Sequence, residues 1–297
     1  MITALPICFY PMRKIVLDDD YAFSQSILLK MHQENFASYN SPELTLKYLL
    51  QEYRPTLTKT DLLIKDLSSH HIVNINVEKL KESIQEPSND ISILFIDYHM
   101  PEMNGIEFLK KIQKLPIKKV LLTGETDYKI GIDAFNSGLV DAYIRKDDLN
   151  FSTLIQNITT ELEWKYFTEL SNLVPNILDF DYLKNPNFFE LFKQFIEENG
   201  ITKFYLTHLQ GDFVLLNKNE EKQHLLVRNK DQLKYLTEIA KEDGADFETI
   251  EKLETAKVIP FFNSKEYWEV PANEWSKYLH STLAISSDDN LVWAIIK

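Results

Sequence analysis

Apolar residues in the first half of the chain follow two patterns. Short uninterrupted runs predict buried strands, and apolar residues that recur every three or four positions predict helices with one buried face. We expect strands at 13–19, 36–39, 92–97, 119–123 and 142–145, separated by helices at 21–34, 42–53, 105–114 and 128–137. Strands that alternate with helices predict a doubly wound, five-stranded parallel sheet with helices on both faces.

The interval between the second and third predicted strands is longer than this plan requires. Two strand–helix repeats need roughly 40–50 residues, and the excess maps to about 54–90. This segment has its own apolar pattern, so we expect an ordered insertion. His70 and His71 lie within it, but no third ligand accompanies them at a recognisable spacing, which favours a structural or surface role over a metal site.

The second half of the chain has a different pattern. A long helix is expected at 151–175, followed by a helix at 188–198, strands at 202–209, 212–217 and 223–228, helices at 231–243 and 246–257, and final strands at 282–286 and 291–296. Short turns between successive strands favour an antiparallel α+β domain. We therefore divide the chain into a first domain at 1–150, a linker helix and linker at 151–183, and a smaller second domain at 184–297.

Composition narrows the class of protein. The chain has 297 residues and a net charge of −13, which argues against broad attraction to nucleic acid or to anionic membranes. Its one cysteine, Cys8, excludes an internal disulfide, as is usual in a reducing cytosol. The short apolar segment 1–11 contains two prolines and has no basic start, so we expect an extension packed on the first domain and not a signal peptide. We expect a cytoplasmic protein with no membrane partner.

Carboxylates follow two of the predicted strands directly. Asp18 and Asp19 end the first strand and Asp97 ends the third, and Asp20 is expected to be a solvated loop residue. The carboxyl ends of parallel strands open onto the crevice where ligands bind. Like charges held close together are costly unless a cation neutralises them, so this cluster predicts Mg²⁺ and phosphate chemistry.

These carboxylates belong to a larger set of motifs at strand ends. The set comprises Asp18-Asp19, Asp97 in Asp-Tyr-His-Met-Pro-Glu-Met-Asn-Gly, Thr123 after Val-Leu-Leu, Ala134-x-x-x-Gly138, and Lys146 after Ala-Tyr-Ile-Arg. Over most of residues 12–165 the chain resembles the receiver domain of bacterial two-component response regulators. Each motif alone is weak evidence, but five in the same order are specific.

The resemblance implies a phosphorylation site. Asp97 would be the nucleophile that accepts a phosphoryl group. Asp19, Asp97 and the backbone carbonyl of His99 would hold Mg²⁺, with Asp18 acting mainly through a bound water. Such a receiver catalyses only its own phosphorylation and dephosphorylation, so we do not expect an enzyme that acts on another substrate.

The resemblance also implies roles for residues around that site. Lys146 would supply a mobile cation, and the Thr123 hydroxyl would follow the phosphate once it is attached. Tyr143 matches the switch aromatic of the family, and His99 and Glu125 match positions that tune the phosphate lifetime. The implied partner is a sensor histidine kinase or a phosphotransfer protein.

The Lys146–Asp147 peptide bond and Gly105 are two positions where the backbone conformation can be predicted. Lys146 is followed by Asp147, where the family usually has proline in a cis bond, and a cis Lys-Asp bond would cost about 3 kcal/mol. We therefore expect a trans bond or a strained loop. Gly105 is expected to let the loop before it turn with positive φ.

The output of the second domain has three candidate readings. We favour protein interaction, including a homodimer formed on phosphorylation through the last receiver elements or the helix at 151–173. Residues 231–257 resemble a helix-turn-helix, but the expected recognition helix carries Asp246, Glu248 and Glu251, which disfavours DNA binding. A small-ligand sensor is the third candidate. Its pocket would use the aromatic residues Phe261, Phe262, Tyr267, Trp268, Trp275, Tyr278 and Trp293.

Overall fold

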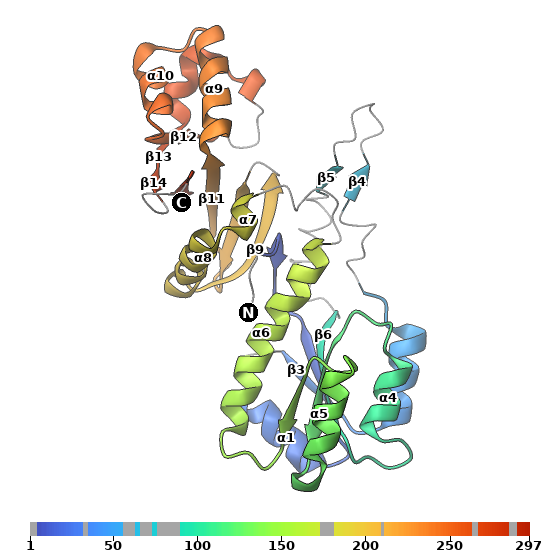
Figure 1. Ribbon diagram of the computed structural model, residues 1–297. Coiled ribbons are helices and arrows are strands. Elements are labelled where there is room, and N and C mark those ends of the chain that lie inside the picture. Colours follow the sequence, from blue (N-terminus) through green and yellow to red (C-terminus); the bar gives the residue numbers. More distant parts are fainter. Residues whose placement is uncertain are drawn as a thin grey trace.

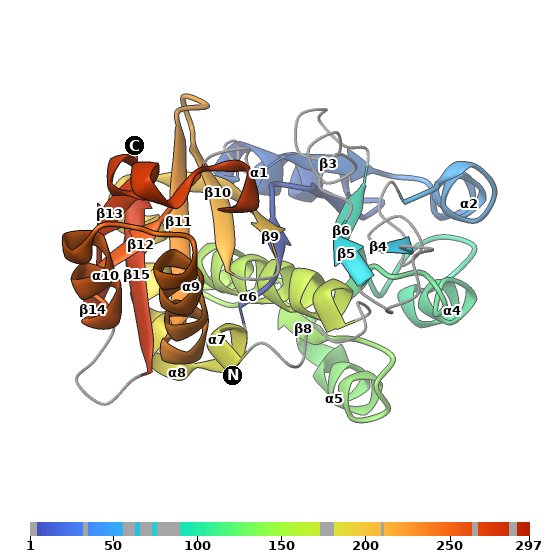
Figure 2. The ribbon, with the colours of Figure 1, turned by 90° about the horizontal axis from the view of Figure 1, so that it is seen from above.

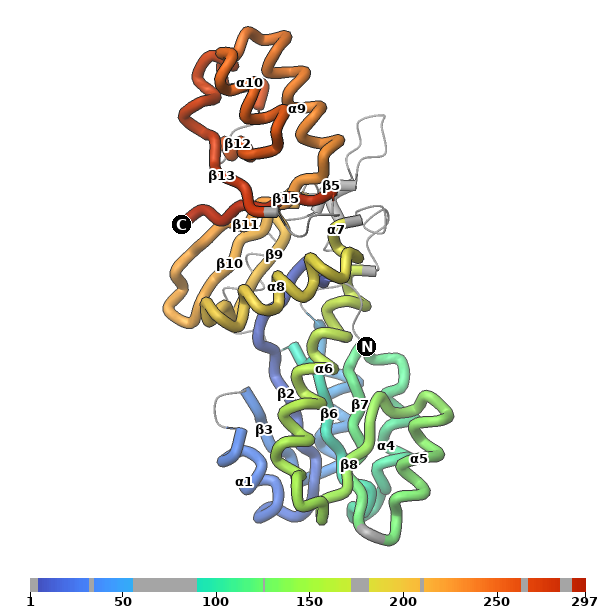
Figure 3. Tube along the Cα trace, turned by 60° about the vertical axis from the view of Figure 1, so that its left-hand side comes forward, coloured from blue at the N-terminus to red at the C-terminus, as the bar shows by residue number. Residues whose placement is uncertain are grey.

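The computed structural model describes residues 5–31, 35–55, 63–65, 73–75, 90–172, 181–208, 211–262, 267–284 and 290–297. The described elements form an elongated molecule. A parallel sheet with its helices lies at one end, an antiparallel sheet lies in the middle, and the helix pair α9–α10 lies at the other end (Figures 1 and 3). Helix α6 runs from the parallel sheet towards the antiparallel sheet.

The parallel sheet has five strands in the order β3-β2-β6-β7-β8. Every neighbouring pair is parallel. The strands are β2 (Arg13–Leu17), β3 (Phe36–Tyr39), β6 (Ile91–Asp97), β7 (Lys118–Thr123) and β8 (Ala142–Arg145). The predicted five-stranded parallel sheet is therefore confirmed, with strand limits within two residues of those expected from the apolar runs.

Helices cover both faces of this sheet. They are α1 (Tyr21–Lys30), α2 (Pro42–Lys47), α4 (Gly105–Lys111), α5 (Tyr128–Asn136) and α6 (Phe151–Asn172). Ile15 and Leu17 pack with Phe108 of α4 on one face, and Val16 packs with Ile27 of α1 on the other. Burial on both faces explains why these strands are continuous apolar runs instead of alternating patterns.

The helix expected at 42–53 changes its type part of the way along. It is an α-helix to Lys47 and a π-helix over Tyr48–Glu52. The N–H of Tyr53 donates to the carbonyl of Tyr48, five residues earlier, at 2.8 Å. The wider turn directs Tyr53 into the core, where its hydroxyl accepts from the N–H of Ile91 at 3.1 Å. Periodicity alone does not predict such a turn.

Helix α6 takes part in both halves of the molecule (Figure 2). Its first half contributes Phe151 and Ile155 to the core of the parallel sheet, and its second half contributes Phe167 and Leu170 to the core of the antiparallel sheet. Between the two halves, Glu163 forms a buried ion pair with Lys14 of β2, with 2.8 Å between Oε1 and Nζ. The predicted helix is confirmed as far as Asn172, and residues 173–175 lie outside the described range.

The second sheet has six strands in the order β1-β9-β10-β11-β15-β14, and each neighbouring pair is antiparallel. They are β1 (Cys8–Phe9), β9 (Ile201–His208), β10 (Asp212–Asn217), β11 (Lys222–Asn229), β14 (Leu283–Ala284) and β15 (Leu291–Ile296). The predicted antiparallel α+β region is confirmed. The N-terminal segment differs from our expectation: Cys8 pairs with Tyr205, so this segment is an edge strand of the second sheet.

Four helices accompany the second sheet. They are α7 (Asp181–Lys184), α8 (Pro186–Asn199), α9 (Lys230–Glu242) and α10 (Phe247–Glu254). Phe188 and Phe192 of α8 pack against Phe204 and Phe213 of the sheet. Helix α10 ends three residues before the expected limit, and Ala256, with φ of +52°, lies in a conformation that a right-handed helix cannot continue through.

Two short pairs of strands complete the described elements. Strands β12 (Val258–Pro260) and β13 (Leu279–Ser281) form an antiparallel pair that the sequence did not suggest, beside the short helices Tyr267–Glu269 and Ala272–Tyr278. Strands β4 (Leu63–Lys65) and β5 (Val73–Ile75) pair within the predicted insertion. Most of 54–90, with His70 and His71, lies outside the described residues. No described helix is both long enough and apolar enough to cross a bilayer.

Candidate functional site

The carboxyl ends of the parallel strands carry the residues singled out by their motifs. Asp18 follows β2, Asp97 ends β6, Thr123 ends β7 and Lys146 follows β8. Strand register aligns these ends, since Leu17 pairs with Ile96 and Thr123 pairs with Arg145. The sheet therefore brings together side chains that are far apart in sequence.

Asp18, Asp19 and Asp97 form an acidic cluster. One carboxylate oxygen of each residue lies within 4.8 Å of the others. Asp18 is completely buried and Asp97 is 6% exposed, whereas Asp19 faces solvent. Burial raises the pKa of Asp18, the hydrogen bond from Lys146 opposes that rise, and the charge of Asp97 adds to it.

The donor set of this cluster fits a hard divalent cation. Oxygen ligands at a buried edge, with one open acidic side, are what Mg²⁺ uses when it retains several waters. Receiver domains generally hold Mg²⁺ through such a cluster. Here Asp18, Asp19 and Asp97 are the residues that would contribute the carboxylates.

Lys146 reaches into the acidic cluster. Its Nζ lies 2.7 Å from Asp18 Oδ2 and 2.9 Å from Asp97 Oδ1, and the side chain is 22% exposed. Burial lowers the pKa of Lys146, but the hydrogen bonds from its ammonium to the two carboxylates outweigh burial and leave the pKa raised. A single lysine thus neutralises part of a cluster of three acids.

The loop around Lys146 has no proline to shape it. The described residues contain no cis peptide bond, so the Lys146–Asp147 bond is trans. The N–H of Lys146 donates to the Thr123 carbonyl at 2.9 Å, and Arg145 forms a two-point ion pair with Asp147 at 3.1 and 2.5 Å. These bonds fix the backbone that a cis proline would otherwise constrain.

Asp20 has a structural function in addition to being solvated. It is the N-cap of α1, where its Oδ1 accepts from the N–H of Phe23 at 3.0 Å. Its own N–H donates to Asp18 Oδ1 at 3.0 Å. The start of α1 is therefore coupled to the acidic cluster.

Thr123 and Tyr143 occupy neighbouring strands. Thr123 is completely buried, and its hydroxyl makes a long contact of 3.5 Å with the Ile144 carbonyl. The ring of Tyr143 lies against Gly131 of α5, where an added Cβ would come within 2.9 Å of it, and it meets Phe135 edge-on. The ring is half-buried against α5.

His99 contacts a residue that the motifs did not identify. Its Nε2 lies 2.8 Å from Asp127 Oδ2, so the loop after β6 and the helical turn Glu125–Asp127 are joined at the mouth of the site. The His99 side chain is 69% exposed. The side chain of Glu125 lies outside what the structure describes. Asp127 is four residues after Thr123, and that spacing at a strand end was the available signal.

Gly105 is needed for a reason other than the one expected. It is not among the residues with positive φ; it begins α4 after the N-cap Asn104. A Cβ at this position would lie 2.4 Å from the Asp97 carbonyl oxygen. The glycine permits close approach of α4 to the end of β6, and our prediction of positive φ was wrong.

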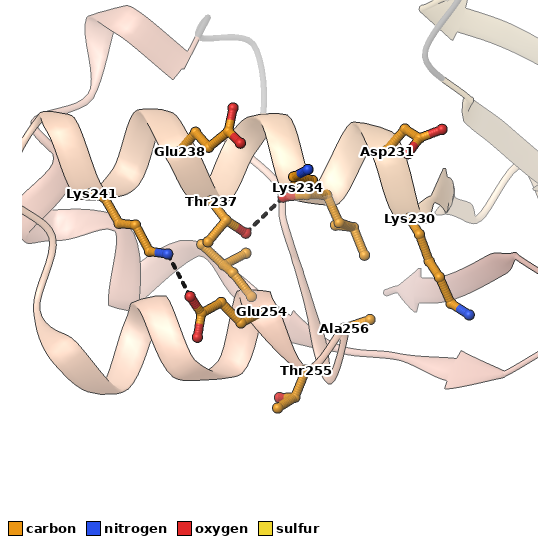
Figure 4. Close-up of a pocket in the computed structure, with 11 residues that line it drawn as sticks. Lys230, Asp231, Lys234, Thr237, Glu238, Lys241, Glu254, Thr255 and Ala256 are labelled. Atoms are coloured by element: carbon orange, nitrogen blue, oxygen red, sulfur yellow. Dashed lines mark hydrogen bonds and ion pairs between the residues drawn. The ribbon is translucent and has the colours of Figure 1, made fainter.

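A second candidate site lies between α9 and the end of α10 (Figure 4). It is a groove of about 440 Å³ whose lining includes Lys230, Lys234, Lys241 and Glu254. Lys241 and Glu254 form an ion pair at 2.5 Å, and no ion pair joins Lys230 or Lys234 to another described residue. Asp231 and Glu238 belong to the same lining, so the groove presents charges of both signs, with no net charge, beside an apolar floor.

Four of the seven aromatic residues proposed to line a ligand pocket pack together in one core, namely Phe262, Tyr267, Trp275 and Tyr278. Trp275 is completely buried against Phe262, and its Nε1 donates to the Val270 carbonyl at 3.0 Å. Trp293 lies on the antiparallel sheet against Phe195. None of the seven aromatic residues lines the described groove, so these rings mainly stabilise cores.

Comparisons with known proteins find matches for the part of the chain that forms most of the parallel sheet. Residues 69–159 match the family model described as the response regulator receiver domain. Response regulator SaeR of Staphylococcus aureus strain USA300 is 41% identical over 68 residues, which are 22% of this chain and 29% of SaeR. The chain thus spans less than a third of the curated relatives it matches.

A solved structure matches the whole chain. The structure of the Legionella pneumophila response regulator LqsR aligns with a TM-score of 0.83 and 27% sequence identity, over 100% of this chain and 90% of that one. The likeness includes the antiparallel sheet as well as the parallel sheet. With the strand-end acids and Lys146 in place, the chain contains a receiver domain of the response regulator family.

Proposed function

We propose that this protein is the response regulator of a two-component phosphorelay and that Asp97 is its phosphorylated residue. The observation that carries the proposal is the convergence of Asp97 with Asp18, Asp19 and Lys146 at one sheet edge. The phosphoryl donor is a sensor histidine kinase or a phosphotransfer protein.

The chemistry follows from the positions of these groups. A carboxylate oxygen of Asp97 forms the bond to phosphorus while the donor's bond to phosphorus breaks, and the leaving group keeps the bonding electrons. Lys146, 2.9 Å from Asp97, offsets the negative charge of the arriving group. Asp19, Asp97 and the His99 carbonyl would hold Mg²⁺, with Asp18 acting mainly through a bound water, and the bound ion would supply positive charge to the phosphoryl oxygens.

Phosphorylation then changes the surface beside β8. The Thr123 hydroxyl leaves its 3.5 Å contact with the Ile144 carbonyl and bonds to the phosphoryl group. Tyr143, packed on Gly131, responds to the space that Thr123 vacates or fills. The output is protein interaction, with a homodimer as the form that phosphorylation favours.

Incubation with acetyl phosphate and Mg²⁺, followed by intact-mass measurement, tests the phosphorylation site. We expect the wild-type protein to gain one acid-labile phosphoryl group and Asp97→Asn to gain none. Asp133→Asn, which changes an exposed aspartate of α5, is the matched control. Uptake by Asp97→Asn equal to that of the wild type would assign phosphorylation to another residue.

Light scattering with beryllofluoride, a phosphoryl mimic, tests the output. We expect the mass of the wild-type protein to double and that of Asp97→Asn to stay constant. An unchanged wild-type mass would exclude phosphorylation-dependent dimerisation.

DNA binding through residues 231–257 is disfavoured. Two lysines of this segment are already paired, Lys241 with Glu254 and Lys252 with Glu248. Paired lysines have little charge left for phosphate neutralisation, which supplies most of the affinity for DNA. Retention on a nonspecific DNA column above physiological salt would reverse this preference.

The groove of Figure 4 is the observation that favours a ligand sensor as the second candidate. Lys230 and Lys234 would contact an acidic group of a small molecule, and Asp231 and Glu238 in the same lining would favour one that carries a cationic group as well. A fragment library observed by NMR, with Lys230→Ala and Lys234→Ala as controls, tests it. Zwitterionic fragments that bind the wild type but neither variant are expected.

A further inference from the structure

Lys146 contacts an aromatic ring as well as two carboxylates. Its ammonium lies 4.6 Å from the centre of the Phe23 ring. The face of an aromatic ring attracts a cation through the electron density of the whole ring and not through a lone pair. Such a contact tolerates rotation of the ammonium, whereas the hydrogen bonds to Asp18 and Asp97 have fixed directions.

The position of the Phe23 ring is fixed from two sides. Its backbone N–H is held by the N-cap Asp20 in the first turn of α1, at 3.0 Å. Its ring packs against Phe151, the first residue of α6, with 5.4 Å between ring centres. The ring is half-buried, so the contact with Lys146 is shielded in part from water.

The backbone bonds of the loop do not direct the end of the lysine side chain. Thr123 holds the N–H of Lys146, and the Arg145–Asp147 ion pair holds the turn. Four methylene groups separate this backbone from the ammonium, and each adds rotational freedom. Among the described residues, the two carboxylates and the ring are therefore the groups that place the ammonium.

These two kinds of contact differ in what happens during phosphoryl transfer. In the proposed function Asp18 and Asp97 are also the groups that hold Mg²⁺ and the phosphoryl group, so their pull on Lys146 decreases when the site is filled. The ring of Phe23 has no competing ligand. It is the contact that stays constant through the reaction.

We propose that Phe23 is a positioning residue for phosphoryl transfer, whose ring face keeps the Lys146 ammonium beside Asp97 while the carboxylates are engaged. The inference rests on the proposed function. Under this proposal, the first turn of α1 helps to position the Lys146 side chain. The residue after this lysine is Asp147 and not the proline that is usual in the family.

A series of fluorinated phenylalanines at position 23 tests the proposal. Fluorine withdraws charge from the ring face while the shape of the ring changes little. At saturating Mg²⁺ we expect the phosphorylation rate with phosphoramidate to fall stepwise from phenylalanine to monofluoro-, difluoro- and trifluorophenylalanine, by about tenfold over the series. A ring that acts only by packing would give equal rates.

Ordinary substitutions supply the rescue and the control. Phe23→Leu should lose about tenfold in rate, and Phe23→Trp, which restores a ring face, should recover most of it. Phe36→Leu is the matched control, because Phe36 is a half-buried ring in the same core that packs against Phe95. It should leave the rate unchanged.

A double substitution identifies the partner of the ring. In a Lys146→Ala background, Phe23→Leu should cause no further loss, since the two residues act as one unit. A further loss, or equal rates along the fluorinated series, would overturn the inference while leaving the proposed function intact. A wild-type protein that takes up no phosphoryl group would overturn the proposed function, and the inference with it.

Discussion

Two acidic regions of this protein have opposite electrostatic designs. At the edge of the parallel sheet, Asp18, Asp19 and Asp97 converge within 4.8 Å, and Asp18 and Asp97 share Lys146. On the helix pair α9–α10, Glu248 and Glu254 each have a lysine of their own. Acid content alone does not create a cation site. Strand ends force carboxylates together, whereas helices α9 and α10 spread them along a surface, where Glu248 and Glu254 each meet a separate lysine.

The largest expected difference comes from removal of the lysine in each region. Lys146→Ala should lower the free energy of unfolding of the metal-free protein by about 2–4 kcal/mol, because it leaves the buried Asp18 and Asp97 without a cation. Lys241→Ala should cost less than about 1 kcal/mol, because its partner is exposed. Urea denaturation in EDTA, followed by circular dichroism, measures both. Equal costs would remove the distinction between the two regions.

The second largest difference is expected in the stabilisation by Mg²⁺, which should depend on the acidic cluster and not on the helix pair. At ten times its dissociation constant, Mg²⁺ should stabilise the wild-type protein by about 1.4 kcal/mol. Asp18→Asn should lose most of this gain, and Asp246→Asn should keep it, because Asp246 caps α10 and is no part of the acidic cluster. Thermal denaturation with and without Mg²⁺ is the measurement, and a full gain in Asp18→Asn would exclude a metal role for Asp18.

The pH dependence of stability should have opposite signs in the two regions. Burial raises the pKa of Asp18 above that of the unfolded chain, so its contribution is present at low pH and is lost as the pH rises through the folded-state value. The hydrogen bond from the Thr249 backbone lowers the pKa of Asp246, so its contribution is present above the unfolded value and is lost as the pH falls.

In EDTA, Asp18→Asn should therefore become less destabilising from about pH 3 to about pH 6, and Asp246→Asn more destabilising over the same range. Denaturation curves of the two variants against wild type at both pH values are sufficient. The same sign of change in both variants would contradict the contrast.

The smallest expected effect is at the groove. Glu254→Gln should change the free energy of unfolding by about 0.5 kcal/mol, and most of that change should disappear at high salt, because both partners are about half exposed. Urea denaturation at low and high salt measures it. A salt-independent loss of several kcal/mol would mean that this pair is a structural element of the helix pair.

Local patterns predicted most of the fold. Strands β3, β8, β10 and β15 have the limits that their apolar runs predict, because burial and turn residues act within a few positions. Strand β1 has two residues, and its partner strand lies far along the chain, so no local signal distinguished it from an extension. The π-turn at 48–52 depends on the hydroxyl of Tyr53 reaching β6, which is also a non-local contact.

The residues of the candidate site also fall into those that local sequence patterns identified and those that depend on non-local contacts. Asp18, Asp19, Asp97, Thr123 and Lys146 were identified because strand ends are visible in sequence, and their functional roles remain a proposal. Phe23 and Asp127 were missed. Phe23 contacts Lys146 and Asp127 contacts His99, and these contacts depend on side-chain directions that no sequence pattern specifies. The need for Gly105 arises from a close approach to the end of β6 and not from its own backbone angle.

The edge strand β1 cannot pair until its partner strand β9 has been synthesised. Cys8 pairs with Tyr205, and the Ile7 carbonyl accepts from the N–H of Leu206 at 2.7 Å, so β1 leaves the ribosome well before its partner strand, which is made nearly two hundred residues later. At roughly 5–20 residues per second that delay is about 10–40 s. The parallel sheet can assemble in that time, so the nascent chain would carry a complete acidic cluster at that sheet while Phe9 and its neighbours still lack their partner strand. The order of synthesis therefore lets the parallel half fold, with its acidic cluster in place, before the antiparallel sheet is complete.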